Sequence, residues 1–582
     1  MVNVKLADES YKLSLEYNHD QPTAPKALYV AKNDRVAFQL ILESDTRYCV
    51  NVGQSEWVPA GKKSNGFTKV RIAAKSPFET TVNHIGLVTD DDNYKKADII
   101  LNNDVCEYLK HTPSAVWVET VVPCDAVSGE YTVDVSIFTS TNGTDESLLT
   151  KISVPLTVLD YKMDDLKDGD FYLDLWQHNS NIARKYDVKL WSDEHFEVIE
   201  PIVKALADLG QKSITIIASE IPWFGQGCTD GLEFGSNMFE YSIIPITKKA
   251  DGTFFYDYSI MQRYIDLCRN YGISGDIEVF GLVNIWMPEN KLRLFPHEVE
   301  NYPENAIKLR YFDEESESFK YIRDGEQVKD YIRSLYNYFI KTNQLAQVRI
   351  AADEPGDIEK YRKSMAMIKE LCPDALCACA INHAEFIEEF SDVIDCFVPY
   401  LRCTIKEYDK LMEYKQSLTD KRFMWYVCCG KASPNTFIYS KPIESRAIGL
   451  TTSYLKLDGF LRWAFNIWPD DPRNEIRFSA FECGDAHFIY PATNGKLLYT
   501  IRYKNMQRGL GDYQLISKIE KKYGREKVDE LIAKLYRLDD VHNYYNKDEN
   551  GKITTAKDPD EVFSTDWNDW NELKREMIEL VK

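Results

Sequence analysis

The chain has 582 residues, 44% of them hydrophobic, and carries a formal net charge of −22 at pH 7. This length predicts more than one domain, each with an apolar core. The negative charge, with no compact basic patch, argues against nucleic acid or an anionic membrane as a partner. The segment Met1–Ser10 lacks the apolar core of a signal peptide, and no apolar run reaches the roughly 20 residues of a membrane helix. We therefore expect a cytoplasmic protein with no membrane insertion.

The sequence contains 13 cysteines, several of them in apolar, strand-like runs, such as Cys377, Cys379, Cys428 and Cys429. This placement predicts reduced, buried thiols rather than a disulfide framework. The five cysteines between residues 372 and 403 lack a Cys-x-x-Cys pair, the usual ligand spacing of a zinc site. We therefore expect neither a metal nor another cofactor.

Residues 1–165 read as all-β, because strand-like runs recur and helical periodicity is scarce. A β-sandwich of two packed sheets is the architecture that this pattern predicts. The clearest strand-like runs are Arg35–Glu43, Ala115–Val122, Glu130–Phe138 and Ile152–Leu159. The polar stretch 160–170 then predicts a linker.

Residues 166–525 alternate strands with helical segments, which predicts a (β/α)8 TIM-type barrel. The eight expected strands are Phe171–Trp176, Ser213–Ala218, Ile277–Val283, Val348–Ala352, Leu376–Ala380, Cys396–Tyr400, Arg422–Cys428 and Phe460–Phe465. The clearest helices are Asp193–Leu209, Ile260–Tyr271, Gln327–Thr342, Ile358–Leu371, Ser440–Leu455 and Leu498–Tyr523. A doubly wound sheet is the alternative, but it calls for a glycine-rich phosphate loop after an early strand, and none is present.

Residues 526–582 predict a helical extension at the carboxyl end, with helices over Lys527–Tyr545 and Trp567–Lys582. Between them, Asn546–Ile553 resembles the first half of an EF-hand loop. The position of the bidentate glutamate is Lys557, so a solvated turn is the better interpretation.

The most informative feature is the adjacent pair Asp353 and Glu354, which follows the apolar run Gln347–Ala352 and precedes Pro355. Carboxyl ends of parallel strands are where barrel enzymes build their active sites. Two neighbouring carboxylates do not readily both ionise, so we expect one to stay protonated near neutral pH. A proton donor beside an anion is what cleavage of a glycosidic bond requires. The competing interpretation is a helix N-cap, but Asp357 already fills that position.

A second carboxylate is missing from the place where many retaining barrel glycosidases keep their nucleophile, the end of the seventh strand. Here that strand, Arg422–Cys429, contains no acid. This absence favours a substrate-assisted mechanism, in which a 2-acetamido carbonyl oxygen attacks C1 to form an oxazolinium ion. Glu354 would be the general acid and base, and Asp353 would orient the acetamido group.

Two alternatives stay open at this point. The first is a glycosidase acting on a non-acetamido sugar, with a second protein carboxylate such as Asp470, Asp471 or Asp485 as nucleophile or base. The second is a non-catalytic carbohydrate-binding protein, against which the intact Asp-Glu pair argues.

The chain resembles glycoside hydrolase family 123, the β-N-acetylgalactosaminidases, and the related domains of unknown function that share its carboxyl-terminal region. The resemblance spans nearly the whole chain. It rests on Trp176-Gln-His-Asn179, Trp191-Ser-Asp-Glu-His195, Ala352-Asp-Glu-Pro355, the block Gly459–Pro469, Gly484-Asp485 and Arg508-Gly-Leu-Gly-Asp-Tyr513. It implies an exo-acting hydrolase that removes terminal β-linked N-acetylgalactosamine from glycans or glycosphingolipid-type oligosaccharides. By the same resemblance, Asp353 orients the acetamido group and Glu354 is the acid/base.

Aromatic and polar side chains near the expected strand ends are the candidates for substrate binding. A sugar site needs an apolar wall for the ring and the acetamido methyl group, and polar groups for the hydroxyls. The aromatic candidates are Trp176, Tyr400, Trp425, Tyr426, Trp463 and Trp468, and the polar ones are Asn382, His383, Asn466 and Asp485. Alternation along a strand sends Trp425 and Tyr426 to opposite sides, so we expect about half of the aromatics to be packing residues. We expect His178 to be structural.

Overall fold

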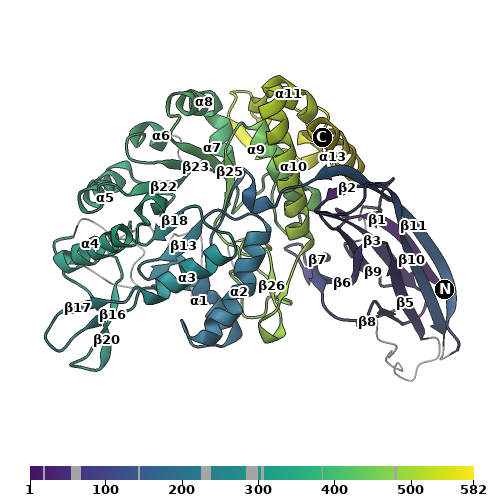
Figure 1. Ribbon diagram of the computed structural model, residues 1–582, viewed down its shortest axis with the longest axis horizontal. Coiled ribbons are helices and arrows are strands. Elements are labelled where there is room, and N and C mark those ends of the chain that lie inside the picture. Colours follow the sequence, from purple (N-terminus) through teal and green to yellow (C-terminus); the bar gives the residue numbers. More distant parts are fainter. Residues whose placement is uncertain are drawn as a thin grey trace.

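The computed structural model describes residues 1–16, 20–53, 67–141, 144–223, 238–283, 299–302, 307–382, 385–477 and 481–582. Its strand-rich amino-terminal part lies on one side of a parallel barrel, and the helices at the carboxyl end lie between the two (Figure 1). The β-rich character expected for the first 165 residues and the parallel barrel after it are therefore both confirmed.

The amino-terminal part contains two sheets. The five-stranded sheet has the order β1 (Val2–Asp8), β3 (Asp34–Ser44), β9 (Ser114–Val122), β6 (Glu79–Thr89), β7 (Lys95–Leu101). The six-stranded sheet has the order β2 (Leu28–Lys32), β11 (Ser147–Lys162), β10 (Gly129–Thr141), β5 (Thr68–Lys75), β4 (Tyr48–Asn51), β8 (Val105–Tyr108).

Strand β3 is buried on both faces, which explains its nearly continuous apolar sequence. Phe38 and Leu40 belong to the large apolar core that also holds residues of the six-stranded sheet. Ala37 and Ile41 point the other way, because side chains alternate along a strand. They pack with Ile501, the first residue of helix α10 (Ile501–Tyr523). The five-stranded sheet thereby rests on the barrel domain.

Eight parallel strands form the barrel. In spatial order they are β12 (Tyr172–Leu175), β25 (Gly459–Arg462), β24 (Arg422–Tyr426), β23 (Cys396–Pro399), β22 (Leu376–Ile381), β21 (Val348–Asp353), β18 (Ile277–Phe280) and β13 (Ile214–Ile217). A parallel bridge between Leu173 and Gln211 brings β12 beside the start of β13 and so closes the ring. In chain order β21 is the fourth strand and β24 the seventh, as the sequence predicted.

Helices cover the outside of the barrel (Figure 1). They are α1 (Asn179–Tyr186), α2 (Asp193–Asp208), α3 (Ser259–Asn270), α4 (Gly325–Lys341), α5 (Ile358–Leu371), α6 (Glu385–Glu389), α7 (Leu401–Lys406), α8 (Tyr408–Ser417), α9 (Pro442–Tyr454) and α10. An excursion that the sequence did not reveal adds a small sheet of β17 (Phe254–Tyr256), β16 (Ile246–Lys248), β19 (Arg310–Asp313) and β20 (Ser318–Tyr321).

Helices α9 and α10 cross in direct backbone contact. A Cβ atom on Gly509 would lie 2.0 Å from the carbonyl oxygen of Arg446, and one on Gly449 would lie 2.1 Å from that of Gly509. Only glycine fits at these two positions. Beside the crossing, the buried Arg446 guanidinium donates to Asp512 Oδ2 at 2.7 Å. The block Arg508–Tyr513 is therefore a packing motif rather than part of the site.

The carboxyl end differs from the sequence-based expectation. The helix expected over 527–545 is the shorter α11 (Arg525–Ile532), and a hairpin of β28 (Tyr545–Lys547) and β29 (Ile553–Ala556) follows. In its turn, Asp548 Oδ1 accepts hydrogen bonds from the amides of Asn550 and Lys552, both at 2.9 Å. The carboxylate thus orders a turn, which is the interpretation preferred over an EF-hand. Helices α12 (Pro559–Val562) and α13 (Trp567–Val581) end the chain.

Candidate active site

The two adjacent acids sit where strand β21 ends. Asp353 is the last residue of the strand, and Glu354 follows with a left-handed backbone, φ 43°. The Glu354 amide still donates to the carbonyl oxygen of Ala380 on the neighbouring strand at 2.9 Å. Consecutive residues of a regular strand face opposite sides. The left-handed turn allows both carboxylates to line one cavity, and such backbone strain in a residue other than glycine is typical of functional sites.

Neither acid is needed to start the next helix. Asp357 is the N-cap of α5, and its Oδ1 accepts a hydrogen bond from the Lys360 amide at 3.0 Å. The capping role that competed with the catalytic interpretation is therefore filled by the residue expected to fill it.

The cavity at the acid pair has a volume of about 270 Å³. Seven of the residues singled out from the sequence line it: Trp176, Asp353, Glu354, Asn382, Tyr400, Tyr426 and Trp463. They come from six strands or strand ends, so the fold gathers them from positions far apart in the chain. Asp353 is 8% exposed, whereas Glu354 is only partly buried. Glu354 is thus the acid nearer to solvent.

Two hydrogen bonds fix the carboxylate of Glu354. The Tyr426 hydroxyl donates to Oε1, and Asn382 Nδ2 donates to Oε2 at 3.1 Å. Burial raises the pKa of Tyr426 well above its ordinary value, and the negative charge of Glu354 adds to the effect. The hydroxyl therefore keeps its proton and remains a donor. The hydrogen bond between Tyr426 and Glu354 joins the ends of the seventh and fourth strands across the cavity.

Aromatic rings form one wall of the cavity, and buried carboxylates hold two of them. Trp176 Nε1 donates to Asp174 Oδ2 at 3.1 Å, and Trp463 Nε1 donates to Asp485 Oδ1 at 3.2 Å. Phe481 packs on Trp463 with ring centroids 4.9 Å apart. Fixed aromatic faces of this kind suit the C–H faces of a sugar ring.

Asp485 does not line the cavity, so it is a support rather than the substrate contact that the sequence suggested. Its side chain is fully buried and pairs with Arg462, whose Nη2 lies 2.7 Å from Oδ1. Its Oδ2 accepts from the Cys429 amide at 3.0 Å. Because one carboxylate holds Arg462, Trp463 and Cys429, it ties the end of β25 to the end of β24.

Three further candidates also lie away from the cavity walls. Trp425 points out of the barrel, and its Nε1 donates to Thr452 of helix α9 at 2.8 Å. Trp468 is completely buried, with Nε1 donating to the carbonyl oxygen of Ile489 at 2.7 Å. Asn466 is buried and bonds both backbone groups of His178. His383 lies outside the described residues.

His178 is structural, as expected. Its Nε2 lies 2.8 Å from the carbonyl oxygen of Trp463, and the side chain is 1% exposed. Burial lowers the pKa of its imidazole to about 4, so the ring stays neutral at physiological pH. Its role is to fix the backbone that carries Trp463.

The sequence reasoning missed several residues that line the cavity. They are Trp223, Met238, Ala380, Cys428, Cys429, Leu461 and Phe481. Trp223 follows the end of the second strand, so its position was a usable signal. Phe481 lies well past the end of a strand, and nothing in the sequence pattern places it near the acids. The two cysteines were assigned to the core.

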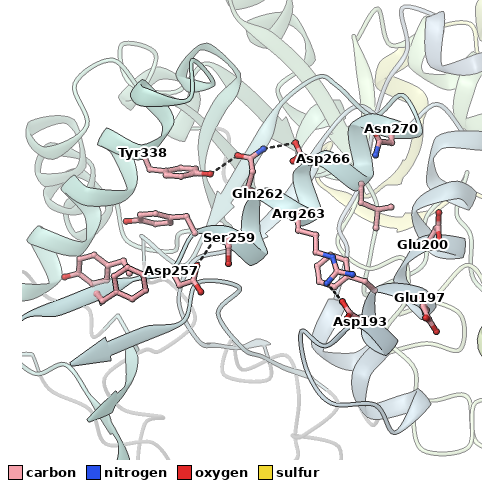
Figure 2. Close-up of a pocket in the computed structure, with 15 residues that line it drawn as sticks. Asp193, Glu197, Glu200, Asp257, Ser259, Gln262, Arg263, Asp266, Asn270 and Tyr338 are labelled. Carbon is pink, nitrogen blue, oxygen red and sulfur yellow. Dashed lines mark hydrogen bonds and ion pairs between the residues drawn. The ribbon is translucent and has the colours of Figure 1, made fainter. Parts of the chain in front are cut away.

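A larger concavity lies outside the barrel, between α2, α3 and β17, with a volume of about 1100 Å³ (Figure 2). Several of its polar groups are held by neighbouring side chains. Arg263 pairs with Asp193 at 2.7 Å, and Gln262 Nε2 donates to Asp266 Oδ1 at 2.8 Å. It is not at the strand ends, where barrel enzymes place their chemistry. The smaller cavity with the acid pair is therefore the candidate active site.

One group among the described residues brings three possible metal ligands together. Atoms of Asp90, Asp91 and Cys483 lie within 4.8 Å of one another. Both carboxylates already have cationic partners, since Lys96 is 2.8 Å from Asp90 and Arg477 is 3.0 Å from Asp91. None of these residues lines the cavity of the acid pair.

Comparison with known proteins agrees with this geometry. The profile of the glycoside hydrolase 123 catalytic domain matches residues 176–519, more than half of the chain. The chain belongs to glycoside hydrolase family 123. It is therefore a glycoside hydrolase, and the matched region contains the acid pair and every described residue of the cavity. No curated protein matches.

Solved structures add the likeness in fold. A family 123 glycoside hydrolase from Clostridium perfringens, described as hydrolysing glycolipid glycans, has a TM-score of 0.74 and 16% identity. The alignment covers 100% of this chain and 98% of that one. A putative glycoside hydrolase from Bacteroides vulgatus has a TM-score of 0.31 and 10% identity, over 85% of this chain and 78% of that one. The family 123 fold thus extends over the whole chain, amino-terminal sheets included.

No helix within the described residues combines the length and the apolar character needed to cross a bilayer.

Proposed function

We propose that this hydrolase removes terminal β-linked N-acetylgalactosamine by a retaining, substrate-assisted mechanism. One observation carries the mechanism: among the described residues, the only carboxylates that line the cavity are the adjacent Asp353 and Glu354. A protein nucleophile would have to approach the sugar from the face opposite the acid, ~5 Å away. At the end of the seventh strand, where such a group is often found, stands Tyr426.

The two acids have different surroundings, which supports different roles. Glu354, nearer to solvent, protonates the departing glycosidic oxygen and then takes a proton from the incoming water. The acetamido oxygen attacks C1 as the glycosidic bond breaks, giving an oxazolinium ion. The buried Asp353, at the strand end, accepts a hydrogen bond from the acetamido N–H and stabilises the positive charge that develops.

The other walls fit the rest of an N-acetylated sugar. Trp176 and Trp463 offer flat faces for the ring and the acetamido methyl group. Tyr400 and Tyr426 bring hydroxyl groups into the cavity. The hydroxyl of Tyr426 already donates to Glu354, so Tyr400, whose pKa is raised by burial, is the hydrogen-bond donor to the acetamido oxygen. A volume of about 270 Å³ is at the small end for a ligand site, which favours a single terminal sugar.

The choice of N-acetylgalactosamine on a glycolipid or related glycan rests on the family and on the Clostridium perfringens relative. A direct test compares three aryl β-glycosides that share one leaving group: the N-acetylgalactosaminide, the N-acetylglucosaminide and the galactoside. We expect hydrolysis of the first and none of the third, because the galactoside has no acetamide. Equal turnover of the galactoside would rule out substrate assistance. Binding without turnover of any of the three would indicate a carbohydrate-binding protein.

A further inference from the structure

Two consecutive cysteines, Cys428 and Cys429, both line the candidate active site. They follow the end of strand β24 at Tyr426. In an extended chain their side chains would point to opposite sides. Cys429 has a left-handed backbone, φ 51°, and this turn brings the second side chain to the same side as the first. The two thiols influence each other's pKa, so they are near neighbours in the cavity.

We propose that Cys428 and Cys429 form a dithiol site that takes up trivalent arsenicals and related thiophiles able to bridge two sulfur atoms. The class of ligand follows from the placement of the two thiols, since consecutive cysteines that line one cavity suit an atom that bonds to both sulfur atoms. No other described cysteine lines this cavity. Of the other described cysteines, Cys124 is exposed and Cys106 half-buried, and the remaining ones are buried.

The backbone at Cys429 is fixed by a hydrogen bond before any ligand binds. The Cys429 amide donates to Asp485 Oδ2, and Asp485 is itself fixed by its buried ion pair with Arg462. A chelator that is ordered before binding loses little conformational entropy when the ligand arrives. Cys429 is exposed and Cys428 half-buried, so a ligand from solvent meets one thiol first and closes onto the second.

Electrostatics favours a bridging ligand over simple oxidants or alkylating agents. The neighbouring Cys429 thiol lowers the pKa of the Cys428 thiol, but burial raises it, and the result is about 11. The interaction with the Cys428 thiol raises the pKa of Cys429 above its ordinary value, and the negative charges of Asp485 and Glu354 add to the effect. Both thiols therefore stay protonated near neutral pH, which slows attack on peroxides and alkyl halides.

The reaction with phenylarsine oxide balances without an oxidant or reductant. Two S–H bonds and the As=O bond break, two As–S bonds form, and the oxygen leaves as water with both protons. The arsenic remains trivalent. The phenyl group then occupies a cavity of about 270 Å³ that Glu354 shares, so the adduct blocks entry of a sugar. This last consequence rests on the proposed function, whereas formation of the adduct does not.

The test uses the full-length protein with phenylarsine oxide at near-stoichiometric concentration, and intact-mass spectrometry reads the adduct. We expect one phenylarsenic per chain, released by a dithiol such as dithiothreitol but not by an equal thiol concentration of a monothiol. Digestion of the wild-type adduct should place it on the peptide with residues 428 and 429. Mapping to another peptide, or no adduct, would overturn the proposal, and this measurement needs no variant.

Cysteine variants provide a second test of the dithiol site. Cys428→Ser and Cys429→Ser should each lose dithiol-reversible binding, while Cys124→Ser, which alters an exposed thiol outside the cavity, should keep it. Thermal unfolding of each variant checks that it is folded. Equal binding by the Cys429→Ser protein contradicts the site. Inhibition by phenylarsine oxide is then expressed relative to the hydrolysis rate of the same protein without the reagent. If the adduct forms without inhibition, the inference that it blocks entry of a sugar is wrong. If the protein hydrolyses its substrate but forms no adduct, the dithiol site is wrong and the proposed function is unaffected.

Discussion

The hydroxyl of Tyr426, at the end of the seventh barrel strand, donates a hydrogen bond to Glu354, which follows the fourth. A tyrosine thus stands where a retaining barrel glycosidase with a protein nucleophile often carries a carboxylate. The contact gives Glu354 a fixed orientation in the cavity without adding a second negative charge. In the proposed mechanism, the tyrosine therefore orients the proton donor and also occupies the place of a protein nucleophile.

Removing this hydroxyl tests its contribution. Tyr426→Phe should lower kcat/KM by roughly 10- to 100-fold, because a hydrogen bond to a charged group contributes about 1.5–3 kcal/mol. Steady-state kinetics on an aryl N-acetylgalactosaminide measures the effect. Tyr408→Phe is the matched control, since its hydroxyl bonds the carbonyl oxygen of Leu455 away from the cavity. An unchanged kcat/KM in Tyr426→Phe would show that the hydroxyl does not act on the reaction.

The two acids should differ in their response to the leaving group. Glu354→Gln should lose about 10²–10⁴-fold on a poor leaving group and much less on an activated aryl glycoside, which needs little protonation. Asp353→Asn should impair both substrates alike, because attack by the acetamide is itself affected. Asp357→Asn, which keeps an N-cap outside the cavity, serves as the control. The same leaving-group dependence in both variants would contradict these roles.

A stable mimic of the oxazolinium ion should inhibit the enzyme. A thiazoline built on N-acetylgalactosamine is expected to compete with substrate, because the cavity offers Asp353 to its ring nitrogen. A 2-fluoro sugar with an activated leaving group should give no lasting covalent adduct by mass spectrometry. Detection of a glycosylated peptide would identify a protein nucleophile and end the substrate-assisted account.

Asp485 should influence stability and sugar binding together. Asp485→Asn leaves the buried Arg462 without its counter-charge, at an expected cost of about 3 kcal/mol in the free energy of unfolding. The substitution also weakens the hydrogen bond that Trp463 Nε1 donates to residue 485, so the KM for the sugar substrate should rise. Chemical unfolding and kinetics measure the two effects. Asp193→Asn breaks the exposed pair with Arg263 and should change neither by much. A variant with wild-type stability would argue against the support role.

A pH effect on stability follows from acids buried inside the barrel. Burial raises the pKa of Glu278 well above its ordinary value, and the charges of Asp174 and Asp276 add to it. Burial likewise raises the pKa of Asp174, to about 6. A group whose pKa is higher in the folded state stabilises fully below its unfolded pKa, about 4.3 for glutamate, and loses that contribution as pH rises toward the folded value.

Glu278→Gln removes one titrating group while keeping a neutral side chain of the same shape. Its free energy of unfolding should therefore fall less steeply than that of the wild type as the pH rises from about 5 to 9. Urea unfolding across this range measures the slope. Equal slopes in the two proteins would show that the pKa of Glu278 is not raised in the folded state.

The barrel could be predicted because each strand carries its own local signal. Apolar runs, turn residues and helical periodicity placed the eight strands near their observed positions, and the acid pair fell at the end of the fourth. The helix expected over 527–545 was wrong because its amphipathic pattern does not reveal where tertiary packing ends it at Ile532. In the small sheet, two local hairpins are joined by the pairing of β16 with β19, which lie far apart in the sequence, and such long-range pairing leaves no local trace.

The site was harder to predict than the fold, because proximity to a strand end does not give orientation. Trp425 and Tyr426 are neighbours, yet one bonds helix α9 and the other bonds Glu354. Alternation says that they diverge but not which one faces inward. Asp485 is close to the cavity in space, but its charge is taken up by Arg462. Such a role depends on a contact between segments 23 residues apart, which no pattern within either segment displays.

The left-handed backbone at Glu354 costs folding free energy at the position where the proposed mechanism needs a carboxylate. Glycine adopts this conformation without the steric cost that a larger side chain meets, of the order of 1 kcal/mol. The Glu354→Gly substitution would therefore relieve the steric strain of the backbone at this position but remove the carboxylic acid. The proposed mechanism needs a carboxylic acid at this position, so relief of the backbone strain and retention of activity make opposite demands on one residue.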